Sequence, residues 1–127
     1  MTNQLPLRVL VVDDNHDAAM GLSLIMRALG QQSRITHDGL SAVQAAVEYQ
    51  PNLVLLDLGL PGLDGWEVAK RIRQEPALEK VTLVAVTGYG SDDALRRSEK
   101  AGFNHHLVKP AEIDLLKEIV KSVENMA

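Results

Sequence analysis

Short apolar runs, each followed by a polar side chain, are the main pattern of this chain. The clearest runs cover residues 7–12, 53–56 and 81–86, and weaker ones cover residues 32–36 and about 105–108. Aliphatic and β-branched runs of this length, separated by longer segments, are typical of strands in a parallel sheet that is covered on both faces. The run at 32–36 is less apolar than the others, so we expect it near an edge of the sheet.

Apolar residues at helical spacing mark the segments between these runs. We expect helices over residues 16–29, 40–49, 65–74, 91–100 and about 111–125. Asp64 and Glu67 resemble a capping box, Ser91 is a typical helix start, and Gly30 and Gly102 are typical helix stops. Five alternations of strand and helix predict an α/β fold, in which right-handed crossovers place helices on both faces of one parallel sheet.

The composition narrows the class of protein. A chain of 127 residues with 46% hydrophobic residues fits one domain, with a core over about residues 7–123. The net charge of −4 argues against a nucleic-acid partner, and the lack of cysteine agrees with a reducing compartment. No segment approaches the roughly 18 apolar residues of a membrane span. The first residues, MTNQLPLR, lack the apolar core of a signal peptide. We therefore expect a cytoplasmic domain that does not itself contact the membrane.

Polar side chains that could bind a ligand or take part in a reaction follow four of the five apolar runs. Asp13 and Asp14 follow the first, Asp57 follows the third, Thr87 the fourth and Lys109 the fifth. In a sheet of this kind, ligands and chemistry collect outside the carboxyl ends of the strands. These five residues are therefore expected to meet in one site, although they are scattered along the sequence.

Three carboxylates in one site repel one another and need compensation. At ~4 Å, one such pair costs about 4 kcal/mol at an effective dielectric constant of 20. A divalent cation with oxygen ligands, Mg²⁺ or Mn²⁺, would supply the compensation, and Lys109 would add a fixed positive charge. A carboxylate beside these charges can attack phosphorus and form an acyl phosphate, and Thr87 could donate a hydrogen bond to a phosphoryl oxygen.

The motifs VLVVDD, LVLLDLGLPGLDG, VAVTG and LVKP, in this order and spacing, resemble the receiver domain of two-component response regulators. The resemblance implies a flavodoxin-like (CheY-like) three-layer α/β/α sandwich with strand order 2-1-3-4-5, an order that comes from the family and from no pattern in the chain. It also implies that Asp57 is the phosphoacceptor, that Asp14 and Asp57 bind Mg²⁺ directly, that Asp13 does so mainly through water, and that the backbone carbonyl of Gly59 completes the set.

The same resemblance assigns roles at the other strand ends. Thr87 and Lys109 would bind the phosphoryl group, and Pro110 would hold the lysine loop, often through a cis peptide bond. The donor would be a phosphohistidine on a sensor histidine kinase or on a histidine phosphotransfer domain. A receiver of this kind catalyses its own phosphorylation and slow hydrolysis, and has no external substrate.

Two features depart from the usual receiver pattern. The position three before Lys109 is usually Tyr or Phe, which rotates inward when the threonine closes on the phosphate, but here it is His106. The segment AGFNHHLVKP is also more similar to receivers attached to hybrid sensor histidine kinases, so this chain could be one domain of such a kinase. We hypothesise that phosphorylation of Asp57 pulls Thr87 inward and changes the surface of the fourth helix, fifth strand and fifth helix, including His106.

Other readings of these residues are open. A haloacid-dehalogenase-type phosphatase needs an Asp two residues after the nucleophile, where this chain has Gly59. A flavin-binding flavodoxin-like protein needs a Ser/Thr/Gly-rich loop after the first strand, where this chain has DDNHDAA. A degenerate receiver that binds partners without phosphorylation is a third alternative, against which the complete set of site residues argues.

Several other polar residues have simple interpretations. His105 and His106 could suggest a zinc site, but neighbours on a strand point to opposite faces. His16 and His37 are expected at the surface. The basic residues are expected to form solvated helix faces, namely Lys70, Arg71 and Arg73 on one helix and Arg96, Arg97 and Lys100 on the next.

Overall fold

The computed structural model of the chain describes residues 5–126, so the first four residues of the N-terminal segment discussed above lie outside it. It contains the five expected strands and five expected helices, and one additional short 3-10 helix, η1. In chain order the elements are β1 (Arg8–Val12), α1 (His16–Ala28), β2 (Gln32–Thr36), α2 (Gly39–Tyr49), β3 (Leu53–Leu56), α3 (Gly65–Arg73), η1 (Pro76–Leu78), β4 (Thr82–Thr87), α4 (Asp92–Ala101), β5 (His105–Val108) and α5 (Ile113–Met126).

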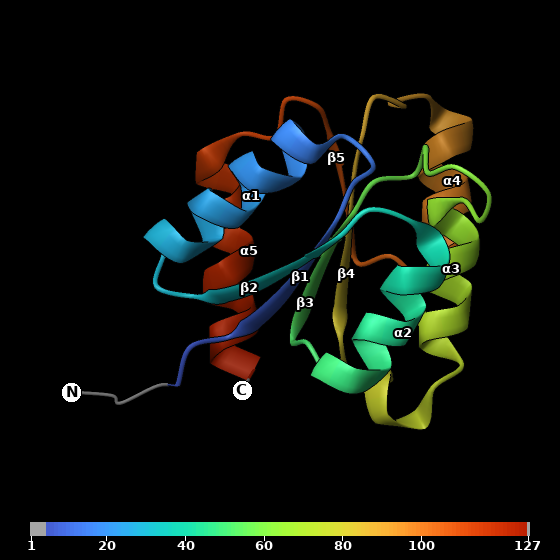
Figure 1. Cartoon of the computed structure of the whole chain (residues 1–127). Helices are drawn as coiled ribbons and strands as arrows, with labels where there is room; N and C mark the ends of the chain where they lie inside the picture. The colour runs from blue at the N-terminus through green and yellow to red at the C-terminus, as the bar shows by residue number, and fades with distance from the viewer. Residues whose placement is uncertain (1–4, 127) are drawn as a thin grey trace.

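The strands form one parallel sheet in the order β2-β1-β3-β4-β5, with β2 at an edge as its weaker apolar character predicts. Figure 1 shows α1 and α5 on one face of this sheet and α2, α3 and α4 on the other. The three-layer α/β/α sandwich and the strand order implied by the family resemblance are thus confirmed. None of the helices in the described part of the chain combines the length and apolar character needed to span a membrane.

The two faces of the sheet build two separate hydrophobic cores. On β1, Leu10 and Val12 pack into the core under α2, α3 and α4, whereas Val9 and Val11 pack into the core under α1 and α5. All four side chains are at most 1% exposed. This double burial explains why the central strands are continuous apolar runs with no alternation of polar residues.

Side-chain caps fix the points at which the helices begin after the loops. Asn15, Asp38, Asp64 and Ser91 each accept a hydrogen bond from the backbone N–H three residues later. Such caps satisfy N–H groups that have no partner within the helix. At the other end of α4, Gly102 adopts a left-handed backbone with φ of 103°, as a helix-ending glycine should.

Arg73 is the one basic residue of α3 for which the expected solvated face is wrong. Lys70 and Arg71 are exposed, but the Arg73 guanidinium is half-buried and its bonds go inward. It donates to the carbonyl oxygen of Gly102 at 2.8 and 3.0 Å and to that of Val81 at 2.7 Å. Arg73 therefore joins the end of α4 to the start of β4, a role that the helical pattern of α3 alone does not reveal.

Candidate functional site

The loops at the carboxyl edge of the sheet bring the predicted site residues together. In Figure 1 these loops lie along the upper edge of the sheet. Val12 and Leu56 are register partners at the ends of β1 and β3, and the backbone N–H of Asp57 donates to the Val12 carbonyl at 2.9 Å. The acids that follow these two strands are therefore neighbours in space. Thr87 is the last residue of β4 itself, one position inside the strand rather than after it.

Asp13, Asp14 and Asp57 form an acidic cluster. Their carboxylate oxygens lie within 4.8 Å of one another, and this is the one group of potential metal ligands found within residues 5–126. Asp13 is 1% exposed and Asp57 9%, whereas Asp14 is open to solvent. A set of oxygen donors with one solvent-facing side suits Mg²⁺, which keeps several of its water molecules. The adjacent His105 and His106 belong to no such group, so the described residues offer no zinc site there.

Lys109 joins two of these carboxylates. Its ammonium nitrogen lies 2.9 Å from Asp13 Oδ2 and 3.3 Å from Asp57 Oδ2. The lysine is placed by its own backbone, because its N–H donates to the Thr87 carbonyl at 2.8 Å. The peptide bond from Lys109 to Pro110 is cis, as the family resemblance implied. A single positive charge thus stands against two buried negative charges.

The surroundings shift the pKa values of this ion pair. Burial raises the pKa of the Asp57 carboxyl, and the charge of Asp13 adds to the effect, while the Gly59 N–H and Lys109 oppose it. Burial alone would lower the pKa of Lys109, but hydrogen bonds and charges from Asp13 and Asp57 outweigh it and raise that pKa. The ammonium therefore stays charged, whereas the ionised form of Asp57 lacks full compensation and would gain from a further cation.

The loop after β3 folds tightly around Asp57. The backbone N–H of Gly59 donates to Asp57 Oδ1 at 3.1 Å. A Cβ atom on Gly65 would lie 2.4 Å from the Asp57 backbone oxygen, so only glycine permits α3 to start this close to the Asp57 backbone. The loop thus binds one carboxylate oxygen of Asp57 and brings the start of α3 against the Asp57 backbone.

Thr87 at the end of β4 and Tyr89 in the β4–α4 loop are joined by a hydrogen bond. Thr87 is 1% exposed, and its Oγ1 accepts a hydrogen bond from the Tyr89 N–H at 3.2 Å. The Tyr89 hydroxyl lies 3.8 Å from where a Cβ on Gly59 would stand. Sequence reasoning missed Tyr89; an aromatic residue two positions after the strand-ending threonine was the available signal.

The histidines lie around the site rather than in the acidic cluster. His106 interacts through its ring nitrogens with Ser98 and with the backbone of Tyr89. His16 and His37, which we expected at the surface, stack on each other with ring centroids 3.7 Å apart. The Nδ1–H of His37 donates to the backbone oxygen of Asp13 at 2.9 Å, so His37 holds the start of the β1–α1 loop.

Comparison with known proteins agrees with this geometry. The profile of the response regulator receiver domain matches residues 9–121. The chain is 32% identical over 114 residues to sporulation initiation phosphotransferase F of Bacillus subtilis, covering 90% of each chain. It is 34% identical over 127 residues to the sensor histidine kinase AtsR of Burkholderia thailandensis, covering 98% of this chain but 21% of that kinase.

Solved structures lead to the same family. The receiver domain of a Pseudomonas aeruginosa sensor histidine kinase, which holds a magnesium ion in its active-site cleft, superposes with a TM-score of 0.87 at 26% identity and covers 95% of this chain and 99% of its own. The family match leaves no support for the phosphatase and flavodoxin alternatives. The chain therefore belongs to the response regulator receiver domains, the phosphoacceptor modules of two-component signalling.

Proposed function

We propose that Asp57 accepts a phosphoryl group from a phosphohistidine on a sensor histidine kinase or a histidine phosphotransfer domain, in a reaction that depends on Mg²⁺ or Mn²⁺. One observation carries this proposal: the carboxylate of Asp57 is held between the Gly59 N–H at 3.1 Å and the Lys109 ammonium at 3.3 Å, inside an acidic cluster. A carboxylate that is both fixed in position and close to positive charge has what a nucleophile toward phosphorus requires.

The acidic cluster would hold the metal ion. In this proposal Asp14 and Asp57 are direct ligands, Asp13 binds mainly through water, and the backbone carbonyl of Gly59 completes the protein's share. When bound, the ion supplies positive charge that neutralises the phosphoryl oxygens. The exposure of Asp14 supports this arrangement, because that side of the cluster is open to an incoming ion and its water molecules.

The remaining residues would act on the phosphoryl group itself. A carboxylate oxygen of Asp57 forms the new bond to phosphorus while the bond from phosphorus to the donor nitrogen breaks, and the donor histidine leaves. Lys109 and the hydroxyl of Thr87 would then bind phosphoryl oxygens. Hydrolysis by water releases inorganic phosphate and regenerates the carboxylate, so the domain catalyses its own phosphorylation, from phosphohistidine or a small acyl phosphate, and its own dephosphorylation.

The test is intact mass after incubation with Mg²⁺ and acetyl phosphate, with Asp57→Asn as the matched variant. We expect one labile phosphoryl group on the parent protein and none on Asp57→Asn. Addition of a chelator should abolish the gain. A phosphoryl group that persists on Asp57→Asn would refute the assignment of the acceptor.

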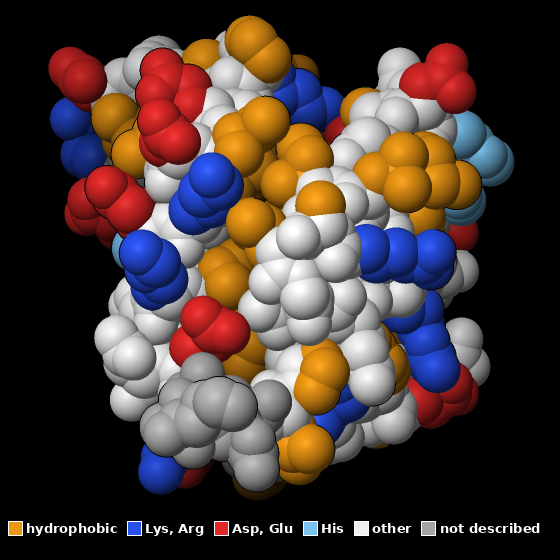
Figure 2. Space-filling view, turned by 90° about the vertical axis from the view of Figure 1, so that its left-hand side faces the viewer, with side chains coloured by type: hydrophobic (Ala, Val, Ile, Leu, Met, Phe, Trp, Pro, Cys, Tyr) orange, Lys and Arg blue, Asp and Glu red, His pale blue; other side chains and the backbone are white. Residues whose placement is uncertain are grey.

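The donor would approach along a groove between α1 and the loop that precedes α5. Hydrophobic side chains gather in the middle of the molecular face that carries α1 and α5 (Figure 2). The groove is lined by Leu22 and Ile25 of α1 and also by Asp13 and Lys109 of the site, so a protein seated in it would reach Asp57. We therefore propose that the helical, histidine-bearing part of the kinase or phosphotransfer domain docks here.

A substitution at Gly21 tests whether the phosphodonor protein docks on this face. It lies in the same groove, and a Cβ placed on it would meet no atom within 4 Å. Gly21→Glu should therefore fold normally, while its charge would oppose an apolar partner. With a histidine kinase that phosphorylates the parent, we expect transfer to Gly21→Glu to slow at least about tenfold, with labelling by acetyl phosphate unchanged. If the rates of phosphorylation by the kinase and by acetyl phosphate fall equally, this face has no role in docking.

We further propose the protein context, the downstream partner and the location of this domain. Residues 1–127 would form one receiver domain with its core at about 7–123, and the alignment with AtsR over 98% of this chain supports an origin in a hybrid kinase. Exposed apolar residues on α4, β5 and α5, namely Leu95, Val108 and Leu115, support a downstream partner on that face. The lack of cysteine supports a cytoplasmic location.

A further inference from the structure

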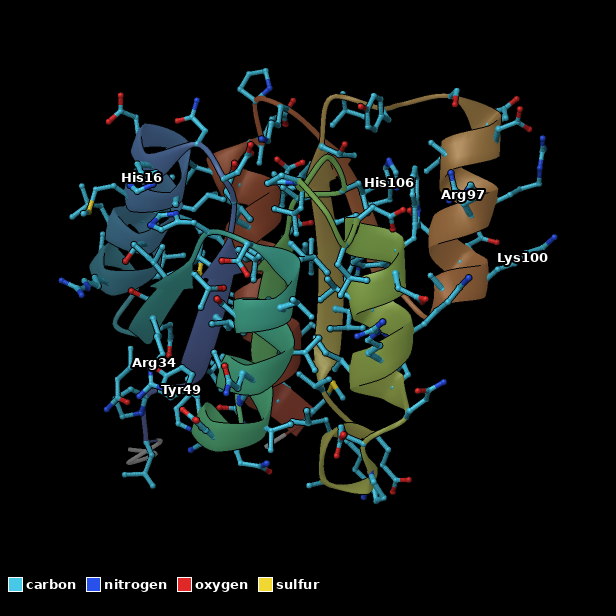
Figure 3. All side chains as sticks on the ribbon, turned by 45° about the vertical axis from the view of Figure 1, so that its right-hand side comes forward. His16, Arg34, Tyr49, Arg97, Lys100 and His106 are labelled. Carbon is cyan, nitrogen blue, oxygen red and sulfur yellow. The ribbon has the colours of Figure 1, made fainter. Side chains whose placement is uncertain are left out.

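His106 lies within a line of hydrogen bonds that begins at Trp66 and ends at the backbone carbonyl of Tyr89. The indole Nε1 of Trp66, on α3, lies 3.1 Å from Ser98 Oγ on α4. Ser98 Oγ lies 2.8 Å from His106 Nδ1, and His106 Nε2 lies 2.6 Å from the backbone oxygen of Tyr89. Figure 3 shows His106 on the side of the sheet that faces α4. We refer to Trp66, Ser98, His106 and the Tyr89 carbonyl as the relay.

When the His106 imidazole is neutral, the chemistry of the end groups fixes the direction of every bond in the relay. An indole N–H can only donate and a carbonyl oxygen can only accept. His106 must therefore carry its proton on Nε2, and in a neutral imidazole Nδ1 is then an acceptor. The Ser98 hydroxyl accepts from Trp66 and donates to His106 Nδ1. Because Ser98 is 1% exposed, water cannot replace a lost partner, and an unpaired hydroxyl there would be costly.

The relay ends at Tyr89, in the loop that follows Thr87, the last residue of β4. The same residue, Tyr89, gives its carbonyl to His106 and its N–H to Thr87 Oγ1. The Tyr89 ring also stacks on the Trp66 ring, with centroids 6.4 Å apart. The Arg97 guanidinium in turn lies 3.7 Å from the centroid of the Trp66 ring. Tyr89 thus ties the β4–α4 loop to the helices in two ways. Its ring contacts Trp66 of α3, and its backbone carbonyl is linked through His106 to Ser98 of α4.

We propose that Ser98 is a positioning residue for the phosphoryl-transfer site: its bond to Nδ1, together with the Tyr89 carbonyl on Nε2, fixes the His106 ring and so sets the position of the loop that follows Thr87. The consequence for signalling rests on the proposed function. If Thr87 closes on a phosphoryl group at Asp57, the Tyr89 carbonyl must move with the loop, and the intact relay favours the open, unphosphorylated position. Ser98 and His106 then replace the usual aromatic switch with a polar restraint.

The first part of the test concerns the resting protein. Nitrogen chemical shifts of the His106 ring, measured by NMR at about pH 8, where an ordinary imidazole is neutral, report which nitrogen carries the proton. We expect the Nε2–H tautomer in the parent protein, a shifted His106 Nδ1 signal and a shifted Tyr89 amide in Ser98→Ala, and parent-like spectra in Ser98→Thr, which keeps the hydroxyl. An Nδ1–H tautomer in the parent, or unchanged His106 and Tyr89 signals in Ser98→Ala, would overturn the positioning role.

The second part concerns the coupling to the site. Beryllofluoride with Mg²⁺, a stable mimic of the phosphoryl group, is titrated into the same proteins. Because Ser98→Ala removes a restraint on the open loop, it should bind the mimic about three- to tenfold more tightly than the parent and Ser98→Thr. Equal affinity in all three would overturn the coupling. If none binds the mimic, the proposed function and the coupling both fail, while the tautomer measurement still decides whether Ser98 positions the loop.

Discussion

Lys109→Met is expected to destabilise the metal-free protein at neutral pH and to leave the Mg²⁺-bound protein almost unchanged. The lysine ammonium is the positive charge that the structure sets against Asp13 and Asp57. Methionine keeps the length and the apolar stem of the side chain, so the comparison isolates the charge. Without it, two buried carboxylates face each other with no counter-ion unless a cation enters the site.

The distances give the size of the effect. Lys109 Nζ lies 2.9 Å from Asp13 and 3.3 Å from Asp57. At an effective dielectric constant of about 20, each contact is worth roughly 5 kcal/mol of attraction, against roughly 3.5 kcal/mol of repulsion between the two acids. The lysine side chain is 34% exposed, which screens the attraction, and the charged groups lose hydration on burial. The net loss expected for Lys109→Met is therefore about 2–3 kcal/mol.

The pH dependence has a definite sign. The raised pKa of Lys109 means that its contribution is complete below the ordinary value of 10.5 and is lost as the pH rises above it. At the acid end, the raised pKa of Asp57 means that this partner begins to take up its proton above pH 3.8. The stability deficit of Lys109→Met should thus be largest near neutral pH and should become smaller in acid as Asp57 takes up its proton.

Urea unfolding followed by the fluorescence of Trp66 measures the deficit, in chelator and in saturating Mg²⁺. Lys121→Met, an exposed lysine on α5, is the control and should stay within about 0.5 kcal/mol of the parent. Mg²⁺ at 100 times its dissociation constant adds about 2.7 kcal/mol to any protein that binds it only when folded. Lys109→Met should gain more than the parent, because the ion no longer competes with the ammonium. A deficit that is absent in chelator, or unchanged by Mg²⁺, would refute the reasoning.

Three further substitutions test other parts of the structure. Arg73→Met should cost about 3 kcal/mol in urea unfolding, because buried carbonyls lose charged donors, whereas Arg71→Met on the exposed face should cost under about 0.5 kcal/mol; equal effects would contradict the inward role of Arg73. Gly65→Ala should destabilise by at least about 2 kcal/mol and slow labelling by acetyl phosphate, because its Cβ would meet the Asp57 backbone; a parent-like melting temperature would show that the loop can yield. Asp14→Asn should weaken Mg²⁺ binding in calorimetry at least about tenfold with little change in metal-free stability, since the side chain is exposed; unchanged binding would exclude Asp14 as a ligand.

The positions of the site residues could be predicted because they depend on topology alone. Each of Asp13, Asp57 and Lys109 follows directly after a strand, and parallel strands present these ends at one edge of the sheet. No side-chain conformation has to be known for this argument. The strand order, by contrast, came from the family resemblance, since apolar runs show which segments are strands but not which strands are neighbours.

Arg73 shows where such reasoning stops. Its place in the helical pattern resembles that of Lys70 and Arg71, and all three suit a solvated face. The partners that draw it inward are the carbonyls of Val81 and Gly102, which lie 8 and 29 residues away along the chain. Carbonyl groups have no signature in the amino-acid sequence, so the pattern of α3 could not distinguish this arginine from its neighbours.

The relay could not be predicted for a related reason, although its serine and its histidine each stand at a notable position in the sequence. Ala94, Ser98 and Ala101 lie at helical spacing on α4, and all three are buried. A serine between two alanines on a buried face needs a hydrogen-bond partner, because buried hydroxyls are almost never left unpaired. His106 reaches that serine only because β5 pairs with β4 in the register that sets His106 beside Ala85. A histidine at the usual aromatic position and a serine on a buried helix face were therefore each visible. Only the strand register joins them into one polar restraint on the β4–α4 loop.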